Sequence, residues 1–334
     1  MKQYFDSAAA QAGLFTLSLR WVIGWTYFSA FWRRLIIDNK LIPEEAGYIG
    51  EKFNHFLPNA LGIKPIIEYL VLNPEALHIA MMVFTIIEAI VGLFLILGLF
   101  TRIMSVGVFF LAMGILLGSG WIGTTCLDEW QIGVLGIASG FVLFLTGSST
   151  YSLDHYLMKN DFAITRNKWF SLIGSGELNI PNLAPKVLQG SVFIFGMTLF
   201  TNQYFHGGVW GTLHNKSVRP KVEISNIHHT EDELNFQLYR VEGADVYGSF
   251  LIGIEILDEN MQVVKSFNQQ DLATLSEDQI KNHYVAKIKP GKHSMIIPLG
   301  AKADVTMDIN DIRIGENYSL KLIDISGIEW IASI

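Results

Sequence analysis

The sequence predicts a bundle of membrane-spanning helices followed by an all-β domain, and three observations lead to this prediction. Half of the 334 residues are hydrophobic and only 16% are charged, whereas charged residues make up about a quarter of a soluble globular chain. Long apolar runs recur up to residue 204. Beyond that point the pattern changes to short segments in which apolar and polar residues alternate.

Five apolar runs approach the roughly 20 residues that a helix needs to cross a bilayer. They predict spans at residues 13–36, 78–100, 102–120, 132–148 and 188–204. The second and third spans are joined by Gly98-Leu-Phe-Thr-Arg102, a turn tight enough to force an antiparallel hairpin. The first run begins too late, and lacks the charged leader and cleavage site, for an ordinary signal peptide. We therefore expect it to stay in the mature protein.

The connections between the spans differ in character. Residues 37–77 contain four prolines and several aromatic residues, which predicts short helices lying over one mouth of the bundle. Residues 161–187 predict a juxtamembrane linker. The predicted domains are a four-span bundle at 1–160, this linker, a fifth transmembrane helix at 188–204 and a β domain at 205–334.

Alternation with a period of two marks the strands of the β domain. Segments such as Leu234-Asn-Phe-Gln-Leu-Tyr and Phe250-Leu-Ile-Gly-Ile-Glu-Ile repeat in this way, as strands with one buried face do. Roughly six to nine such strands in about 115 residues predict an immunoglobulin-like β-sandwich. Residues 270–282 predict a helical or irregular insertion.

Charge and cysteine content exclude several classes of protein. Residues 1–204 hold 12 basic and 13 acidic residues, and residues 205–334 hold 12 and 18. Because the acidic excess lies in the tail, we expect no nucleic-acid partner. A single cysteine excludes an intrachain disulfide, a multi-cysteine zinc site and a Cys-x-x-Cys-His haem attachment. Dinucleotide, Walker and iron–sulfur motifs are also missing from the sequence, so we expect no flavin, haem or metal cofactor.

The one cysteine, Cys126, lies in a short connection between two spans, from Trp121 to Gln131. The thiolate is the reactive form of cysteine. The neighbouring carboxylates of Asp128 and Glu129 would raise the pKa of the thiol, whereas Arg33 and Arg34 would lower it, and both directions stay open. Free cysteine is also often a small buried hydrophobic residue. A reactive Cys126 and a structural Cys126 therefore both stay open.

Two ionisable residues lie deep within predicted spans, Arg20 in the first and Glu88 in the second. Such groups usually face the bundle interior and have a partner, so they are candidates for function, with a purely structural pair as the alternative. One face of the first span combines a charge, a small residue and aromatic rings at helical spacing, namely Arg20, Gly24, Tyr27 and Phe31. This face would line a slot for a flat ring, although ordinary aromatic packing gives the same pattern.

Arg33 and Arg34 follow Trp32 at the predicted end of the first span. Two guanidinium groups can hold a small divalent oxyanion through bidentate hydrogen bonds, and snorkelling to lipid headgroups is the alternative. After the fifth span, His206 and His214 lie in a glycine-rich collar. Their spacing is a poor metal signature, and we expect a structural or substrate-gating role there.

The distribution of basic residues weakly favours a cytoplasmic N-terminus. In this orientation the 37–77 connection, the Cys126 connection and the β domain share the outer side. We therefore expect a multi-pass protein of the cytoplasmic (inner) membrane with an extracytoplasmic β domain.

Several motifs resemble a known group of proteins. Arg20-Trp-x-x-Gly24, Glu88-x-x-x-Gly92 and the turn from Gly98 to Arg102 are similar to the DoxX/DoxD membrane family. The fifth span, the collar Gly-Gly-Val-Trp-Gly-Thr-Leu-His-Asn at 207–215 and the β tail resemble DoxA. Together they resemble a fused DoxD-DoxA thiosulfate:quinone oxidoreductase over nearly the whole chain.

The resemblance implies a thiosulfate dehydrogenase (quinone), which oxidises two thiosulfates to tetrathionate and uses a membrane quinone as its electron-accepting substrate. Within that frame, the hypothesis is that Cys126 is the sulfur nucleophile or carrier, with Asp128 and Glu88 as further catalytic residues. The substrate-binding candidates are Arg33, Arg34, Trp121, Trp130 and His214. The quinone-binding candidates are Arg20, Trp25, Tyr27 and Glu88.

Two other classes of function stay open. The bundle would be a non-catalytic membrane scaffold if the β domain recruits a separate sulfur-metabolism enzyme. A transporter would need discontinuous helices around a polar midplane, and the sequence shows only isolated charges there. The expected partners are thiosulfate, a quinone and the lipid bilayer, and a homo-oligomer is left open.

Overall fold

The computed structural model describes residues 8–43, 45, 47–123, 128–167, 169–178, 180–245, 248–315 and 317–334. The described residues form two compact units. The first unit draws on Met1–Ala46, His78–Gly120 and Asp128–His214. The second draws on Gly47–Leu77, Trp121–Leu127 and Asn215–Ile334. The second unit thus gathers three segments that are far apart in the sequence.

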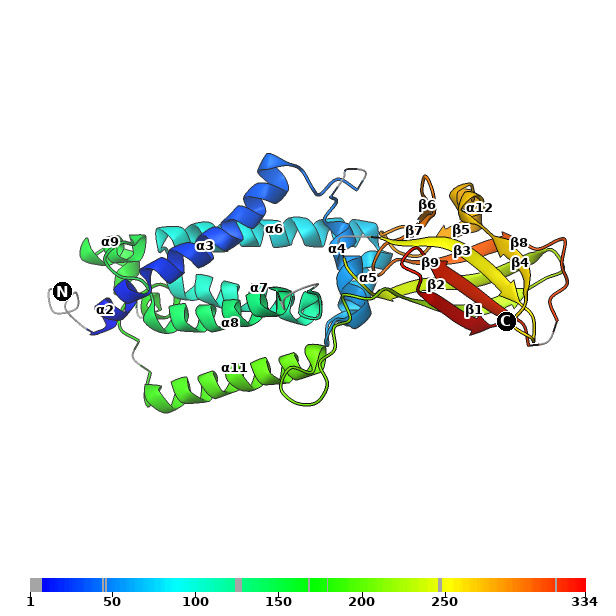
Figure 1. Cartoon of the computed structure of the whole chain (residues 1–334). Coiled ribbons are helices and arrows are strands. Elements are labelled where there is room, and N and C mark those ends of the chain that lie inside the picture. Colours follow the sequence, from blue (N-terminus) through cyan, green and yellow to red (C-terminus); the bar gives the residue numbers. More distant parts are fainter. Residues whose placement is uncertain are drawn as a thin grey trace. The chain divides into compact units, whose positions relative to one another are not determined.

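Four helices of the described chain are long and apolar enough to cross a membrane (Figure 1). They are α6 (Pro74–Leu97), α7 (Thr101–Ser119), α8 (Asp128–Thr146) and α11 (Leu183–His206). Each is a run of strongly apolar residues, which a helix can place in hydrocarbon because its backbone groups bond to one another. The last four predicted spans are therefore confirmed as helices of spanning length.

The first predicted span is a broken helix. It consists of α2 (Ala8–Phe15), α3 (Leu17–Phe31) and the π-helical η1 (Trp32–Ile37). Thr16 interrupts it, and its hydroxyl donates to Ala12 O at 3.1 Å and lies 3.2 Å from the hydroxyl of Thr146. A Ser or Thr hydroxyl that bonds back to the preceding turn bends a helix, which accounts for the break between α2 and α3. As a result, none of the three pieces reaches spanning length alone.

Helices α3 and α6 cross closely at two glycines. A Cβ at Gly24 would lie 2.9 Å from the carbonyl oxygen of Gly92, and a Cβ at Gly92 would overlap the backbone nitrogen of Phe28. Small residues of this kind let two membrane helices approach backbone to backbone. The crossing therefore fixes how far α3 is shifted along α6.

Residues 147–182 are folded against one end of the first unit. They contain α9 (Leu153–Lys159), η3 (Ala163–Arg166) and α10 (Phe170–Ile173). The buried carboxylate of Asp154 accepts hydrogen bonds from the backbone N–H groups of Phe100 at 2.8 Å and Thr101 at 3.1 Å. These are orphan donors at the start of α7, so a distant side chain caps this helix.

Arg102 completes the same end of the bundle. Its buried guanidinium donates to Phe144 O at 2.9 Å, at the end of α8, and to Gly176 O at 2.7 Å. It also donates to Ser171 O. The predicted linker thus contributes backbone acceptors to a buried polar network.

Two antiparallel sheets form the β domain and share one apolar core (Figure 1). The first has the order β1 (Lys221–His229), β2 (Glu233–Glu242), β8 (Lys302–Asp308) and β5 (Ile280–Asn282). The second has the order β10 (Glu329–Ser333), β9 (Ser319–Asp324), β3 (Ser249–Leu257), β7 (Met295–Ile297) and β6 (Lys289–Pro290), with β4 (Val263–Phe267) paired to β3.

The predicted two-layer all-β architecture is confirmed, but the described chain has ten strands rather than six to nine. Three of them, β5, β6 and β7, are only two or three residues long. Alternation cannot be recognised over so few residues. The predicted insertion holds α12 (Gln269–Ala273) and η4 (Glu277–Gln279).

The short helices predicted between the first two spans are present as α4 (Gly50–Phe56), η2 (Leu57–Asn59) and α5 (Lys64–Leu72). They belong to the same compact unit as the β domain. Their apolar residues Leu57, Ala60, Ile67 and Val71 form a small core with Tyr284 of the β domain.

Candidate functional site

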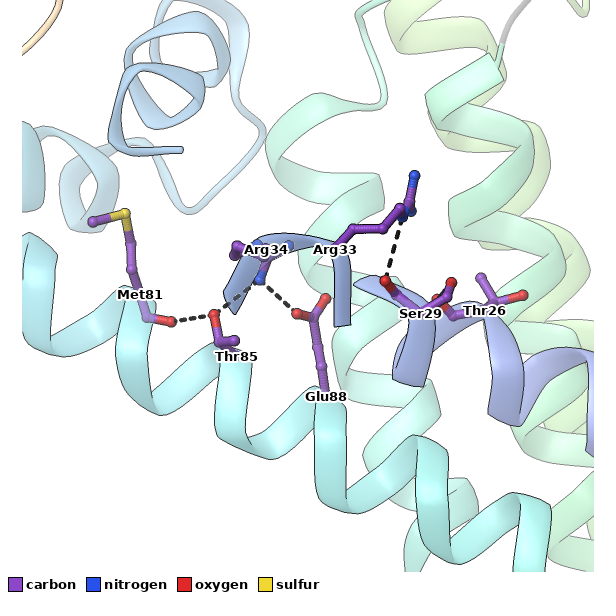
Figure 2. Close-up of polar contacts among 7 residues, drawn as sticks. All are labelled: Thr26, Ser29, Arg33, Arg34, Met81, Thr85 and Glu88. Carbon is purple, nitrogen blue, oxygen red and sulfur yellow. Dashed lines mark hydrogen bonds and ion pairs between the residues drawn. The ribbon is translucent and has the colours of Figure 1, made fainter. Parts of the chain in front are cut away.

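An ion pair lies inside the first unit, between the end of the first helical segment and α6. Arg34 Nη1 lies 2.5 Å from Glu88 Oε2 and 3.1 Å from the hydroxyl of Thr85. Figure 2 shows Arg34 reaching towards these two side chains from η1. Glu88 is 4% exposed, and a buried charge of this kind is stable only with a partner and further hydrogen bonds.

The neighbours of this pair are polar on one side and aromatic on the other. Thr85 is fully buried and donates to Met81 O at 2.7 Å, so its oxygen is free to accept from Arg34. The Arg34 guanidinium also lies 5.7 Å from the centroid of the Phe84 ring, within the range of a cation–π contact. The site therefore combines a carboxylate, a guanidinium and a hydroxyl next to a ring.

Arg33 behaves differently from Arg34. Its side chain is exposed, and its Nε donates to Ser29 O at 3.3 Å, pointing away from Glu88 (Figure 2). The two arginines, predicted as one anion-binding pair, thus separate into one engaged in an ion pair and one that faces outward.

Arg20 lies on the buried face of α3 together with Gly24 and Tyr27, the face that the sequence predicts. Its Nη2 donates to Tyr151 O at 2.6 Å, whereas its Nε and Nη1 have no hydrogen-bond partner among the described residues. The structure brings Arg34, and not Arg20, to Glu88. About 21 Å of helix separates positions 20 and 34 at the α-helical rise of 1.5 Å per residue.

The two aromatic quinone-binding candidates occupy different faces of α3. Tyr27 is buried at 6% exposure, while Trp25 is 58% exposed and packs near Phe28 with ring centroids 6.1 Å apart. Residues two positions apart do not share a helix face. Tyr27 therefore lies inside the bundle and Trp25 on its outer surface.

Trp130 lies in the first turn of α8, next to the end of α11. Its indole N–H donates to the hydroxyl of Thr201 at 3.0 Å, and its ring lies edge-on to His206 with centroids 6.5 Å apart. His206 is buried and its Nε2 lies 2.9 Å from Gly120 O. Since a carbonyl only accepts, Nε2 carries the proton in this contact.

Of the other predicted substrate-binding residues, Trp121 is buried in the second unit, where its indole N–H donates to Phe56 O at 3.1 Å. His214 is exposed, and its backbone N–H donates to His206 O at 3.0 Å. Asp128 is exposed at the first residue of α8. Cys126 lies outside the described residues, between 123 and 128.

Sequence reasoning missed the partners that organise these residues. Asp154 and Thr85 are fully buried, and only the spacing of polar residues within otherwise apolar helices or next to them could have drawn attention to them. For His206 the sequence predicts a structural or substrate-gating role and not metal binding, but it does not indicate the contact with Gly120 O. In the described part of the chain, no three His, Cys, Asp or Glu side chains gather as metal ligands would.

A groove of about 630 Å³ lies between the edge strands β1 and β10 of the β domain. Its lining mixes Lys221, Glu223, Tyr239, Lys302 and Trp330. Lys221 is paired with Glu223 at 3.6 Å, and Lys302 lies over the Tyr239 ring at 5.8 Å. Lys221 thus already faces a carboxylate, and Lys302 an aromatic ring. The groove therefore has little unpaired positive charge that would attract a dianion.

The four apolar helices of spanning length indicate a multi-pass membrane protein. Its helical part and its β domain match two different protein families. Residues 15–181 match the family model of DoxD, described as the TQO small subunit DoxD. Residues 205–333 match that of DoxA, described as the TQO small subunit DoxA. The chain therefore belongs to the DoxD family and carries a DoxA-family domain in one polypeptide, which confirms the resemblance seen in its motifs. Membership of these families points to an oxidoreductase of thiosulfate metabolism with a quinone as electron acceptor.

Proposed function

We propose that this protein is a thiosulfate:quinone oxidoreductase that joins two thiosulfates into tetrathionate and passes two electrons to a membrane quinone. The observation that carries the proposal is the presence of both TQO small-subunit families in one chain. The ion pair buried among the helices supports it, since charges at such depth mark functional sites by default.

The proposed reaction forms one S–S bond between two thiosulfate dianions and releases two electrons. The quinone takes up these electrons together with two protons and becomes the quinol. Thiosulfate supplies no proton, so the protein must deliver both protons to the quinone. A carboxyl group in the bundle is suited to this task because it can hold and release a proton.

We assign quinone binding to Glu88, Arg34 and Thr85, with Tyr27 as a buried wall. Arg34 offers a donor for a quinone carbonyl and Glu88 offers a proton. Thr85, whose hydroxyl proton is already donated to Met81 O, holds the Arg34 guanidinium in place. In this arrangement Arg34 takes the role that the sequence led us to expect of Arg20. Arg20 instead secures the other end of α3 through Tyr151.

The thiosulfate dianion is assigned to Arg33, which is exposed and has no carboxylate in hydrogen-bonding contact among the described residues. An outward guanidinium matches the oxygens of a sulfonate group. Trp121, Trp130 and His214 stay predictions as substrate-binding residues.

Cys126 is proposed as the sulfur carrier, with Asp128 setting its electrostatic surroundings. In the first step the Cys126 thiolate and one thiosulfate form an S–S bond, and the two electrons released reduce the quinone. In the second step another thiosulfate attacks this bond, so that tetrathionate leaves and the thiolate is restored. Attack of this kind is ordinary thiol–disulfide exchange.

We further propose that the protein resides in the cytoplasmic membrane with the β domain on the extracytoplasmic side. The prediction rests on the excess of basic residues in the connections of the opposite side. Thiosulfate would then be oxidised outside the cytoplasm while the quinone is reached within the bilayer.

The test is reduction of a soluble quinone analogue by the purified full-length protein with thiosulfate as donor. Wild type is compared with Cys126→Ser and with Ser225→Ala, an exposed serine-to-alanine control in β1. We expect activity in wild type and the control, and loss in Cys126→Ser with an unchanged unfolding midpoint. Retained activity in Cys126→Ser would move the chemistry to direct sulfur attack on the quinone, and no activity in any of them would favour a non-catalytic scaffold.

A further inference from the structure

We propose that the DoxA-like β domain is bound by a docking surface made of residues 50–72 and 121–123 of the DoxD-like part, and that this binding does not need the covalent tether through α11. Both segments lie within the DoxD match and pack in the same compact unit as the β domain. The partner of the docking surface is a β domain of DoxA type.

Asn54 is the centre of the docking surface. It is fully buried, and its amide is used at both ends: Nδ2 donates to Gly300 O at 3.0 Å, and Oδ1 accepts from the backbone N–H of Ala286 at 3.1 Å. A buried amide that satisfies two backbone groups of another segment is specific in geometry as well as in chemistry.

Gly300 is fitted to this contact from the other side. Its φ is +72°, and a Cβ there would overlap the backbone oxygen of Asn54. Glycine is the residue that accepts both the positive φ and so close an approach of another backbone.

Apolar side chains surround this centre. Leu57, Ile67 and Val71 of the docking surface pack with Tyr284 of the β domain. Burial raises the pKa of Tyr284, as do its hydrogen bond to Glu68 and the charge of that carboxylate. The phenol therefore stays protonated and donates to Glu68 Oε1 at 3.0 Å.

Polar contacts form the rim. Lys52 Nζ lies 2.7 Å from Asp245 Oδ2. Asn59 donates from Nδ2 to Val241 O at 3.0 Å and accepts from Lys216 Nζ at 2.9 Å. An apolar centre with a hydrogen-bonded rim is the usual anatomy of an interface between subunits.

The second segment is tied to both sides. Trp121 donates to Phe56 O and so joins the two parts of the docking surface. Gly123 N donates to the Ser217 hydroxyl at 2.9 Å, and Asn215 Nδ2 donates to Gly123 O at 2.7 Å. These two bonds join the second segment of the docking surface to the residues that lead into β1.

The docking surface thus joins parts of two families within one chain, and each family is described as a TQO small subunit. If this surface is a true subunit interface, the β domain should stay bound when the chain is cut. The collar offers a place to cut, because residues 208–213 are exposed.

The experiment places a protease site in the collar at 208–213 of the full-length protein, cleaves it in membranes and measures the β fragment that a high-salt wash releases. Wild type is expected to retain the fragment. Asn54→Leu is expected to increase its release by about tenfold or more, because two buried backbone groups lose their partners. The control is Asn160→Leu, an exposed asparagine outside the docking surface.

Release of the fragment from cleaved wild type would overturn the proposal, and so would retention by Asn54→Leu equal to that of wild type. If Asn54→Leu does not accumulate, Gly300→Ala attacks the same contact from the β domain and must give the release. The assay contains neither thiosulfate nor quinone, so its outcome is independent of the proposed reaction.

Discussion

Arg34 is bound to Glu88 through one guanidinium nitrogen at 2.5 Å, and this contact joins the end of the first helical segment to the middle of α6. The two residues are 54 positions apart in the chain. Their meeting depends on the crossing of α3 and α6 at Gly24 and Gly92. The ion pair and the glycine crossing are therefore parts of one arrangement.

Removing one partner of this pair should cost more than removing both. Arg34→Gln leaves Glu88 buried without its cation, at a cost of about 3–5 kcal/mol in unfolding free energy. The double variant Arg34→Gln/Glu88→Gln should recover part of this loss. A double-mutant cycle of unfolding midpoints in detergent measures the coupling.

Arg33→Gln is the matched control for this cycle, because Arg33 is exposed and faces away from Glu88. Strict additivity of the Arg34 and Glu88 substitutions would show that the pair contributes no coupling energy.

Gly92→Ala should destabilise the first unit, because the added methyl group overlaps the backbone of α3. Gly114→Ala on α7 is the control, since among the described residues no atom outside the backbone of its own helix turn lies within 4 Å of its Cβ position. There the substitution should be neutral or stabilising by about 1 kcal/mol, as helix propensity dictates. Thermal unfolding of the two variants in the same detergent compares them, and equal midpoints would contradict the close crossing.

Acid should weaken the second unit through His55. Burial first, and then the charge of Lys52, lowers the pKa of His55 from 6.5 to about 4, despite the nearby Asp245. The unfolded chain therefore binds a proton before the folded one, so stability is complete above pH 6.5 and falls as the pH drops to about 4. The loss is about 3 kcal/mol.

Because the pKa of His55 is far below neutrality, its 4.0 Å approach to Asp245 is not an ion pair at pH 7. His55→Gln should flatten the stability profile between pH 7 and 4.5, measured by urea unfolding. His229→Gln, at an exposed position in β1, should leave the slope as in wild type, and a wild-type slope in His55→Gln would refute the assignment.

Asp154→Asn should loosen the start of α7. The amide cannot accept hydrogen bonds at both ends, so at least one of the N–H groups of Phe100 and Thr101 loses its acceptor. We expect a loss of about 1–3 kcal/mol. Hydrogen exchange at the first turn of α7 would report it directly, and Asp161→Asn, in an exposed pair with Arg166, should leave exchange there unchanged.

The sequence allowed the main architecture to be predicted because its signals are local. Apolar runs of spanning length and alternating strands follow from side chains within one element. The buried face of α3, with Arg20 and Tyr27, also follows from helical spacing. The break at Thr16 was not predictable from hydropathy, since it depends on a hydroxyl that bonds back to the preceding turn.

The candidate site was predictable only in part, because its pairing is not local. Helical spacing predicts which face of α3 carries Arg20. It does not predict which residues of α6 lie opposite Arg20, because this depends on where the two helices cross at Gly24 and Gly92. For the same reason Glu88 was expected beside Arg20, while the structure brings it to Arg34. The prolines of the 37–77 connection indicated short helices, but nothing local indicated that Asn54 would bond to Gly300.

The separation of Asn54 and Gly300 by 246 positions also sets an order of events during synthesis. Ribosomes add about 5–20 residues per second, so the buried amide of Asn54 must wait roughly 10–50 s for the backbone that satisfies it. During this interval the first connection is an incomplete half of an interface on a growing chain. Joining the two halves in one polypeptide makes their encounter intramolecular, so it no longer depends on the concentration of a second protein.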